Sequence, residues 1–508
     1  MLDMGASAIR LVVAEINQVG TIRRLEEASR GVQLGRDTFA SGTIRSATID
    51  AALNALDNFS HIIAGYGAPD VWAVATSAVR EARNVDVFLD RIQRRTNIAF
   101  EIVNEAEEGR LIFLAARQAL ADRLELHDAW TLLTEVGGGS TSLTLLHQGQ
   151  PNQSAVYALG ALRLRQRLNL RRLLHDVQVS LLRRTIANAV DEMRQDIPLP
   201  GVTHMVASGG DARFAASQIL ERSPEAGLRE ISRAAFTTFC DEIERLDEEE
   251  IIERYRLTAT EAETLVPALL VYRTLLESTR AEWLLVSDAS LRTGMLLDLA
   301  APGGRSTAED FERQVLASAE AVGDKYRFDR AHGRHVAALA VQLFDEFLDE
   351  HGLAPRDRLL LQVAALLHDV GVYVSIRAHH KHSQYLLAAA QIFGLSNEET
   401  AIVANIARYH RRGLPQQTHL PYVALDRRDR LIVNKLAAML RLANALDAEH
   451  LQKVVSIKLL RHNDRRWVLE ISGTGDLTME QLAATARADM FADTFGRELV
   501  IRTVGAQP

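Results

Sequence analysis

LDMGASAIRL (residues 2–11) and TEVGGGSTSL (residues 134–143) are the two stretches of sequence that decide the fold. In both, a strand end carries an acid, a glycine turn with small polar residues follows, and a second strand begins. Because the same order of residue types occurs twice, the sequence indicates an internal duplication. We therefore expect two similar half-domains, each carrying one glycine turn, with a cleft between them.

The pattern of predicted strands and helices divides the chain into four predicted domains. Up to residue 300, β-branched runs alternate with helical patterns, which is typical of α/β units around a largely buried sheet. These runs are residues 11–16, 71–77, 100–105, 130–136 and 204–210. Residues 301–307 are predicted to form a linker, and the pattern that follows is helical to residue 450. After it, the sequence predicts strands that flank one helix. The predicted domains are residues 1–122, 123–300, 308–450 and 451–508.

Composition excludes several classes of protein. The 508 residues carry 58 basic and 66 acidic side chains, a net charge of −8, which argues against a dedicated binder of nucleic acid or anionic membranes. The single cysteine, Cys240, leaves no disulfide framework and fits a reducing compartment. We find no apolar run long enough to span a bilayer and no basic segment typical of a signal peptide. We therefore expect a cytoplasmic protein.

The basic residues are almost all arginine. The first of the five lysines is Lys325 and none of the five follows a glycine, which excludes a Walker A phosphate loop. A run of arginines lies at positions 163, 165, 167, 171, 172, 183 and 184. Such a run is usually a solvated helix face, but it would also attract a phosphate polymer.

The glycine turns are candidates for anion binding. Backbone N–H groups of Gly137–Gly138–Gly139–Ser140–Thr141 could wrap an anion closely because no Cβ intervenes. Asp3 or Glu135 could hold Mg²⁺ beside it. A third turn, Gly209–Gly210, lies between a strand and a helix and could contact a phosphate chain. The alternative for each is a plain turn.

Two further segments follow predicted strands. In residues 75–84 the hydroxyls of Thr76 and Ser77 are expected to cap a helix, and Arg80 could reach a phosphate or form a surface ion pair. In residues 104–110 the carboxylates of Glu105, Glu107 and Glu108 open a helix. The helix dipole is a sufficient reason for them, although one of them could act as a base that orients water.

The helical half contains candidate metal ligands. His335, the His368–Asp369 pair and Asp447 on packed helices could collect one divalent metal ion. A second group, residues 379–382 with three histidines, lies in the following loop, and His410 comes later. The alternative is a helical scaffold whose buried histidines are hydrogen-bonded core residues.

Taken in order, the segments DMGASAIRL, ATSAVREARN, EEGRLIF and EVGGGSTSL resemble the exopolyphosphatase and guanosine pentaphosphate phosphohydrolase (Ppx/GppA) family. Residues 159–168 and 286–298 are similar to its later segments. The resemblance implies an actin-like (ribonuclease H-like) duplicated double domain in residues 1–122 and 123–300. It also implies an all-α HD-type domain in residues 308–450 and a small α/β domain in residues 451–508.

The resemblance also implies roles for single residues. Glu108 would be the catalytic glutamate that orients or deprotonates the attacking water, and Asp3 and Glu135 would hold Mg²⁺. The predicted phosphate contacts, which include the glycine turns described above, are Gly5, Ser7, Arg10, Arg80, Gly137, Gly138, Gly139, Ser140, Thr141, Ser142, Gly209 and Gly210. The reaction implied is in-line attack on a terminal phosphorus with release of orthophosphate.

The sequence departs from the family pattern at three places. Glu135 replaces an aspartate, Ser142 replaces a glutamate, and Ala6–Ser7–Ala8 replaces a more polar triplet. The leading hypothesis is a Mg²⁺-dependent exopolyphosphatase that releases orthophosphate processively from inorganic polyphosphate. The alternatives are a guanosine pentaphosphate 5′-phosphohydrolase, a catalytically impaired sensor of either ligand, and a phosphohydrolase site in the helical half. The resemblance also implies a homodimer.

Overall fold

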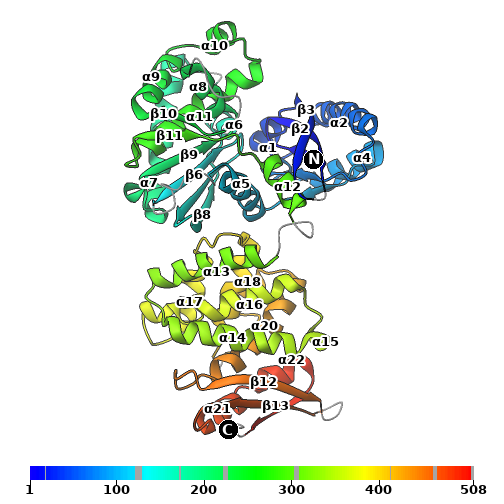
Figure 1. Cartoon of the computed structure of the whole chain (residues 1–508), viewed down its shortest axis with the longest axis vertical. Coiled ribbons are helices and arrows are strands. Elements are labelled where there is room, and N and C mark those ends of the chain that lie inside the picture. The colour runs from blue at the N-terminus through cyan, green and yellow to red at the C-terminus, as the bar shows by residue number, and fades with distance from the viewer. Residues whose placement is uncertain are drawn as a thin grey trace. The chain divides into compact units, whose positions relative to one another are not determined.

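The computed structural model describes residues 1–17, 19–120, 129–170, 173–220, 227–301, 308–411, 413–461 and 466–504. It divides into two compact units, Met1–Phe311 and Glu312–Pro508 (Figure 1). The predicted boundary at 122/123 lies outside the described residues, and the boundary at 450/451 falls inside the second unit and stays a prediction. None of the helices in the described ranges is long and apolar enough to cross a membrane.

The first unit begins with a five-stranded sheet whose order is β3-β2-β1-β4-β5. Its strands are β1 (Leu2–Met4), β2 (Ala8–Ile16), β3 (Ile22–Gly31), β4 (Ala73–Ala75) and β5 (Phe100–Ile102). The first three strands are antiparallel neighbours, whereas β4 runs parallel to β1 and β5 runs parallel to β4. All three residues of β1 are buried, so Asp3, its middle residue, is enclosed in the sheet.

A second sheet repeats this order and adds one strand. Its order is β8-β7-β6-β9-β11-β10, from β6 (Thr131–Val136), β7 (Thr141–His147), β8 (Gln150–Tyr157), β9 (His204–Ser208), β10 (Arg229–Ser232) and β11 (Trp283–Val286). The two glycine turns close with equivalent hydrogen bonds, from Gly5 N–H to the Ala8 carbonyl (3.0 Å) and from Gly137 N–H to the Ser140 carbonyl (2.8 Å). The predicted α/β duplication is confirmed.

Helices cover both sheets of the first unit (Figure 1). They are α1 (Leu34–Ser41), α2 (Ser46–Tyr66), α3 (Ser77–Arg80), α4 (Val85–Thr96), α5 (Glu105–Ala119), α6 (Ala161–Leu168), α7 (His175–Asp196), the 3₁₀ turn η3 (Leu199–Gly201), α8 (Gly210–Ile219), α9 (Arg233–Ile243), α10 (Glu248–Tyr255), α11 (Ala259–Glu277) and α12 (Leu291–Ala300).

Helices α5 and α12 are equivalent in the two repeats, because each follows the outermost strand of the shared five-strand order. They pack against each other. A Cβ on Gly294 of α12 would collide with the backbone of Leu111 of α5, so the glycine permits direct contact between the two helix backbones.

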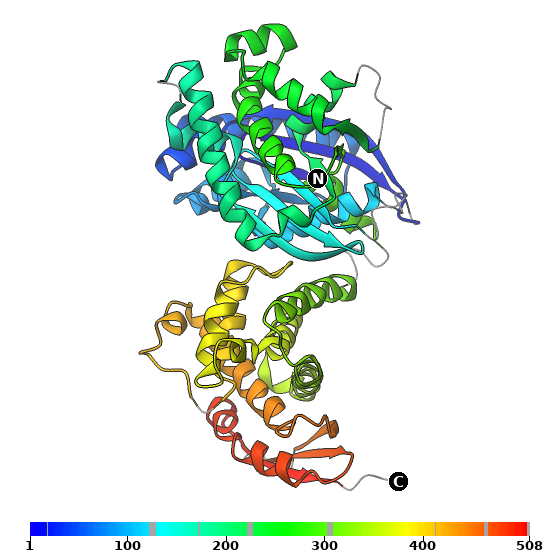
Figure 2. The same cartoon turned by 90° about the vertical axis from the view of Figure 1, so that its left-hand side faces the viewer.

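The second unit is a helical bundle with a small sheet. Its helices are α13 (Ala308–Lys325), which starts just before it, α14 (Arg330–Glu346), α15 (Leu348–His351), α16 (Pro355–Leu367), η4 (Val370–Tyr373), α17 (His379–Ala388), α18 (Asn397–Arg408), α19 (Leu420–Val423) and α20 (Arg427–Ala445). The three-stranded sheet β12-β13-β14 follows, with α21 (Thr478–Thr485) and α22 (Asp489–Phe495) (Figure 2). Its strands are β12 (Val454–Arg461), β13 (Arg466–Gly473) and β14 (Glu498–Thr503).

Candidate active site

A cavity of about 630 Å³ lies in the first unit, where the glycine turns of the two repeats meet. Both repeats contribute to its wall. Of the predicted site residues, the wall includes Asp3, Gly5, Ser7, Arg10, Glu108, Glu135, Gly137, Gly138, Gly139, Ser140, Gly209 and Gly210. It does not include Arg80, Thr141 or Ser142.

The turns are packed so closely that side chains would not fit. A Cβ on Gly138 would lie 2.8 Å from the Ser7 hydroxyl, and one on Gly139 would lie 2.7 Å from the Phe39 ring. Gly160, just before α6, meets the backbone of Gly139. Gly209 has a φ of 121°, which L side chains rarely adopt. Glycine at these positions lets bare backbone line the cavity, which is the arrangement that binds anions.

Glu108 lies on the cavity wall near the start of α5, and one of its carboxylate oxygens has no hydrogen-bond partner. Asn104 caps α5 by accepting the Glu107 N–H (2.8 Å), which places Glu108 in the first turn. Its buried Oε2 has no hydrogen-bond partner and lies 3.7 Å from Arg80 Nη1. Burial raises the pKa of Glu108 to about 7, Arg80 opposes the shift, and the carboxylates of Glu135 and Asp3 add to it. A carboxyl group with this pKa suits a general base at neutral pH.

The second acid of the cavity, Glu135, has a similar environment. Its buried Oε2 is also unpaired, and burial raises its pKa to about 7, against the opposing charge of Arg213. Asp3 is better satisfied, since Arg292 Nη1 lies 3.1 Å and Arg10 Nη1 lies 3.7 Å from its Oδ2. Burial also raises the pKa of Asp211 to about 6. The cavity therefore holds more carboxylate than its hydrogen bonds satisfy.

This donor set fits Mg²⁺. Mg²⁺ prefers carboxylate oxygens and is usually held by one or two of them together with waters and substrate phosphates. Asp3 and Glu135 supply hard oxygen donors beside the glycine turns, and the unpaired Glu135 Oε2 is free to act as one. Among the described residues, the acids of this cavity form no close group of three ligand atoms.

Three predicted phosphate contacts lie elsewhere. Arg80 donates to the Val103 carbonyl (2.7 Å) and to Glu105 (3.3 Å), behind Glu108 rather than on the cavity wall. The Thr141 hydroxyl is buried and donates to the Leu159 carbonyl (2.6 Å). Ser142 lies on β7 directly opposite Glu135.

The predicted side-chain cap at the start of α3 is wrong. Thr76 occupies the N-cap position but makes no capping hydrogen bond, and its hydroxyl instead lies 3.5 Å from the Met4 carbonyl of β1. The hydroxyl therefore joins neighbouring parts of the first sheet rather than the helix.

Four charged residues of the wall had no role predicted from the sequence: Asp211, Arg213, Glu261 and Arg292. Arg213 Nη1 is buried without a hydrogen-bond partner, so it has a donor available for a ligand oxygen. The signal that could have found Asp211 and Arg213 is their position just after the glycine turn at 209–210, at the start of α8. Arg292 lies in the segment 286–298, where the resemblance to the family implies no role for the arginine.

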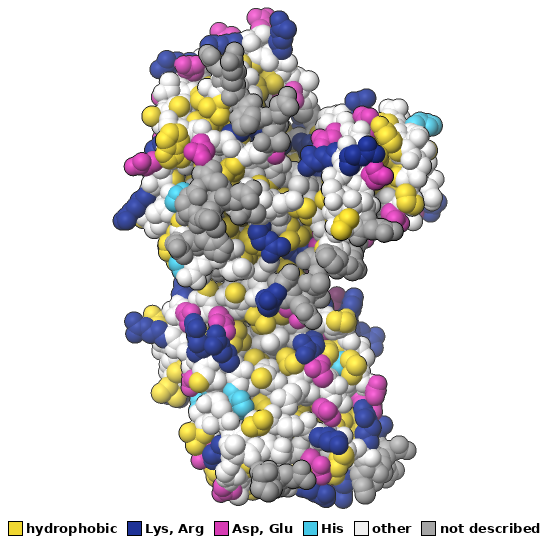
Figure 3. Space-filling model, in the orientation of Figure 1, with side chains coloured by type: hydrophobic (Ala, Val, Ile, Leu, Met, Phe, Trp, Pro, Cys, Tyr) yellow, Lys and Arg dark blue, Asp and Glu magenta, His cyan; other side chains and the backbone are white. Residues whose placement is uncertain are grey.

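Three arginines of the run form ion pairs with acidic residues of the first unit. Arg163 pairs with Glu81 (2.6 Å), Arg165 with Glu248 (2.8 Å) and Arg183 with Glu244. Residues 171 and 172 lie outside the described residues. On the face shown in Figure 3, acidic and basic side chains are interspersed. The charges of these three arginines are therefore balanced by acidic residues of the same unit.

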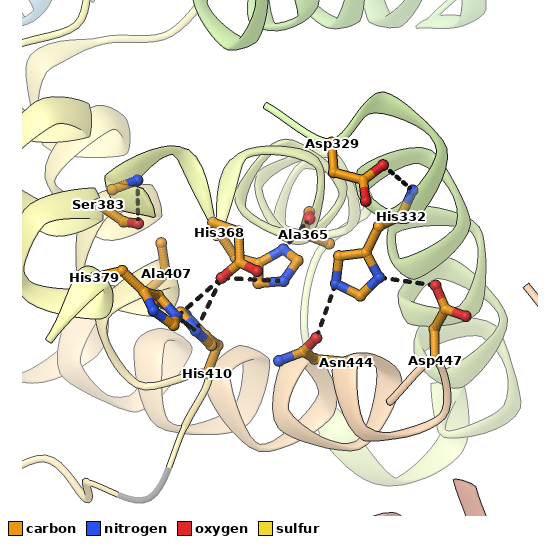
Figure 4. Close-up of polar contacts among 12 residues, drawn as sticks. Asp329, His332, Ala365, His368, His379, Ser383, Ala407, His410, Asn444 and Asp447 are labelled. Atoms are coloured by element: carbon orange, nitrogen blue, oxygen red, sulfur yellow. Dashed lines mark hydrogen bonds and ion pairs between the residues drawn. The ribbon is translucent and has the colours of Figure 1, made fainter. Parts of the chain in front are cut away.

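In the second unit the structure changes the predicted set of metal ligands. His332, not His335, contacts Asp447, with 2.8 Å between Nδ1 and Oδ2 (Figure 4). His335 lies one turn further along α14, and within the described ranges it belongs to no group of three close ligand atoms. Residues three apart on a helix share a face, so the sequence could not separate the two histidines. Around Asp369 the structure gathers His368, His379 and His410 instead.

Comparison with known proteins is consistent with this geometry. The Cytophaga hutchinsonii exopolyphosphatase structure is 23% identical, with a TM-score of 0.52 over 59% of this chain and 96% of that one, and so shares the fold. A guanosine-5′-triphosphate,3′-diphosphate pyrophosphatase of Vibrio vulnificus is 23% identical over 479 residues, 92% of each chain. One from Aeromonas hydrophila is 24% identical over 399 residues, 76% of this chain and 75% of its own.

Family models match most of the chain. Residues 12–301 match the model of the Ppx/GppA phosphatase family, and residues 315–486 match domain III of the Ppx/GppA phosphatases. The first match alone covers more than half of the 508 residues. The HD-type character of the helical region stays a prediction. The chain belongs to the Ppx/GppA phosphatase family, whose members are phosphohydrolases that act on phosphoanhydride bonds.

Proposed function

We propose that this protein is a Mg²⁺-dependent phosphohydrolase that releases orthophosphate from the terminal phosphoanhydride of guanosine pentaphosphate. The observation that carries the proposal is Glu108, a half-buried side chain with one buried, unpaired oxygen and a pKa raised to about 7, in the wall that the glycine turns share. Catalysis of phosphoryl transfer needs positioning and charge stabilisation rather than a covalent group, and this cavity supplies both.

The proposed reaction starts with a water held by Glu108. The carboxylate orients the water for in-line attack on the terminal phosphorus and accepts its proton. Backbone N–H groups of the two turns, with Arg10, Arg213 and Arg292, stabilise the negative charge on the transferred phosphoryl group. Asp3 and Glu135 would hold Mg²⁺, which supplies positive charge to the phosphate oxygens.

Two observations favour guanosine pentaphosphate as substrate. The cavity wall continues from the phosphate turns to Phe214, Leu257 and Leu265, apolar side chains that suit a nucleoside better than a chain of phosphates. The relatives that match over nearly the whole chain are named for this substrate. Three arginines of the run that would attract a polymer, Arg163, Arg165 and Arg183, are paired with acidic residues.

Inorganic polyphosphate is the second candidate substrate. The two glycine turns and the unpaired Arg213 fit the end of any phosphate chain, and a structural neighbour is named as an exopolyphosphatase. A third possibility is a sensor that binds without turnover, favoured by Ser142. A serine opposite Glu135 brings no carboxylate to a position where the family pattern has one.

The test measures orthophosphate release from both substrates with Mg²⁺. Glu108→Gln removes the base, and Glu107→Gln is the matched control, since Glu107 pairs with Arg110 and does not line the cavity. We expect release to fall by about 100-fold or more in Glu108→Gln and by less than about threefold in the control. Undiminished release in Glu108→Gln contradicts the assignment. Tight binding without release in the native protein supports the sensor, and a higher kcat/KM for polyphosphate reverses the order of substrates.

A further inference from the structure

Three consecutive carbonyl groups of the second glycine turn accept hydrogen bonds from one helix, α6. The Ala161 N–H donates to the Gly137 carbonyl (2.9 Å). The Arg163 N–H donates to the Gly138 carbonyl (2.9 Å), and the Nε of the same arginine donates to the Gly139 carbonyl (2.6 Å). The first two carbonyls are therefore held by the backbone of α6, whereas the third is held by a side chain.

These bonds decide where the N–H groups of the turn point. In a planar trans peptide, the carbonyl and the N–H that follows it point in opposite directions. Carbonyls turned toward α6 therefore aim the N–H groups of Gly138, Gly139 and Ser140 away from that helix. All three residues line the cavity, and in the part of the chain that the structure describes none of these N–H groups donates to a protein acceptor. They are the donors with which the turn could bind phosphate oxygens.

The guanidinium of Arg163 is itself fixed by residues of the first repeat. Its Nη2 pairs with Glu81 (2.6 Å), which directly follows α3. Its central carbon lies 4.0 Å from the centre of the Phe39 ring, which belongs to α1. Helices α1 and α6 pack against each other (Figure 1). One side chain of the second repeat thus joins the glycine turn to two elements of the first.

We propose that Arg163, held by Glu81 and Phe39, is a positioning residue that aims the Ser140 N–H at the transferred phosphoryl group. The inference rests on the proposed function, since it concerns the same cavity. Arg163 does not line the cavity, so it acts through the turn and not on the substrate. Because Gly139 has no Cβ, the peptide between it and Ser140 can rotate once its carbonyl loses the Nε donor. The Ser140 N–H would then face the cavity for only part of the time.

The first test is the kinetics of orthophosphate release by Arg163→Met. Methionine removes Nε and the charge but keeps an apolar stem beside Phe39. Complete removal of a preorganised N–H donor costs about 100- to 1,000-fold in rate, and here the donor is only released from its orientation. We therefore expect kcat to fall by about tenfold or more while KM changes by less than about threefold. Arg167→Met, at an exposed position one turn further along α6, is the matched control and should leave both constants unchanged.

The second test is the calorimetric affinity for orthovanadate with Mg²⁺, because vanadate mimics a phosphoryl group during transfer. A merely structural role of Arg163 would lower the number of binding sites and leave the dissociation constant of the folded fraction unchanged. The positioning role predicts native stoichiometry with an affinity about tenfold lower or weaker in Arg163→Met, and native affinity in Arg167→Met.

Glu81→Gln tests whether the first repeat holds the arginine. Glu81 is about two-fifths exposed, so this variant should fold even where Arg163→Met lowers the melting temperature. We expect it to weaken orthovanadate binding by about threefold or more. The double variant should bind no more weakly than Arg163→Met alone, because both changes act through the same guanidinium. Effects that multiply would overturn the proposed role of Glu81.

The remaining outcomes separate this inference from the proposed function. Arg163→Met protein with native kcat and native affinity for orthovanadate overturns the positioning role, as does a loss of binding sites at unchanged affinity. Native protein that binds orthovanadate but releases no orthophosphate contradicts the proposed function alone, since the affinity of Arg163→Met still tests the positioning role. Native protein that binds no orthovanadate overturns the positioning role, because the turn is then not an anion site.

Discussion

Replacing Arg80 by methionine tests whether this arginine acts on phosphate or through Glu108. Its guanidinium lies 3.7 Å from Glu108 Oε2 and does not line the cavity. Its positive charge opposes the burial that raises the pKa of Glu108 to about 7. Methionine keeps most of the apolar stem and removes the charge, so the pKa of Glu108 should rise further and the fraction of ionised base should fall.

The size of the effect follows from the pKa and the exposure of the pair. With a pKa of about 7, about half of the Glu108 side chains are ionised at pH 7. An opposite charge at this range shifts a carboxyl pKa by about 1 to 3 units, and we take the lower end because both side chains are about one-fifth exposed. Loss of the charge then leaves about one-tenth ionised at pH 7, an activity about fivefold lower.

The assay is kcat/KM for orthophosphate release between pH 6 and pH 9. The ratio of native to variant activity should be about tenfold at pH 6 and should approach one at pH 9, where both carboxylates are ionised. Arg80→Lys, which keeps a positive charge, should retain a profile closer to the native one. A deficit that stays constant over this range would refute the reasoning, because it would mean that Arg80 binds substrate.

Three other changes have outcomes that the structure fixes. Glu135→Gln should raise the melting temperature of the first unit by about 2 °C or more at pH 8. A carboxyl group whose pKa is raised in the fold destabilises the protein only at pH values above its ordinary pKa of 4.5, and the full effect is reached above about pH 7. The gain in melting temperature should therefore vanish by pH 4.5, as measured by calorimetry. Gly160→Ala should lower activity at least about tenfold, since its Cβ would displace the turn at Gly139, whereas Gly201→Ala, with open space around it, should leave kinetics unchanged. Ser142→Glu adds a carboxylate opposite Glu135 and should lower the Mg²⁺ concentration needed for half-maximal release; an unchanged requirement would show that this position does not reach the ion.

The repeat was predictable because glycine turns and buried strands leave local signatures. The acid, the glycines and the second strand recur in both stretches, and these short-range features determine the topology of each sheet. The position of Glu108 on the cavity wall could not be predicted from such local features. Three acids open α5, and only the fold shows that Glu107 pairs with Arg110 while Glu108 lines the cavity. The residues alone favoured the helix dipole, and the family resemblance was needed to select one of the three.

The residues that the sequence misplaced depend on long-range packing. His332 and His335 share a helix face, and the position of Asp447 on a distant segment decides between them. His379 and His410 meet at Asp369 only because α17 and α18 pack together. Arg80 was expected to reach a phosphate or to form an ion pair, and in the structure its guanidinium contacts the carbonyl of Val103 and the carboxylate of Glu105. Contacts of this kind, between residues far apart in the sequence, cannot be predicted from the spacing of residues along the chain.

The pairing of α5 with α12 gives the duplicated cavity a polarity. The two glycine turns form a nearly symmetric anion-binding wall. By itself, this wall would let water approach a phosphoryl group equally well from either side. The equivalent helices have diverged, however, so that α5 presents the Glu108 carboxylate and α12 presents the Arg292 guanidinium to the same space. Under the proposed function, Glu108 would hold the water at one end and Arg292 would bind an anionic oxygen at the other. Under the proposed mechanism, this pair of equivalent helices with opposite charge would set the direction of attack.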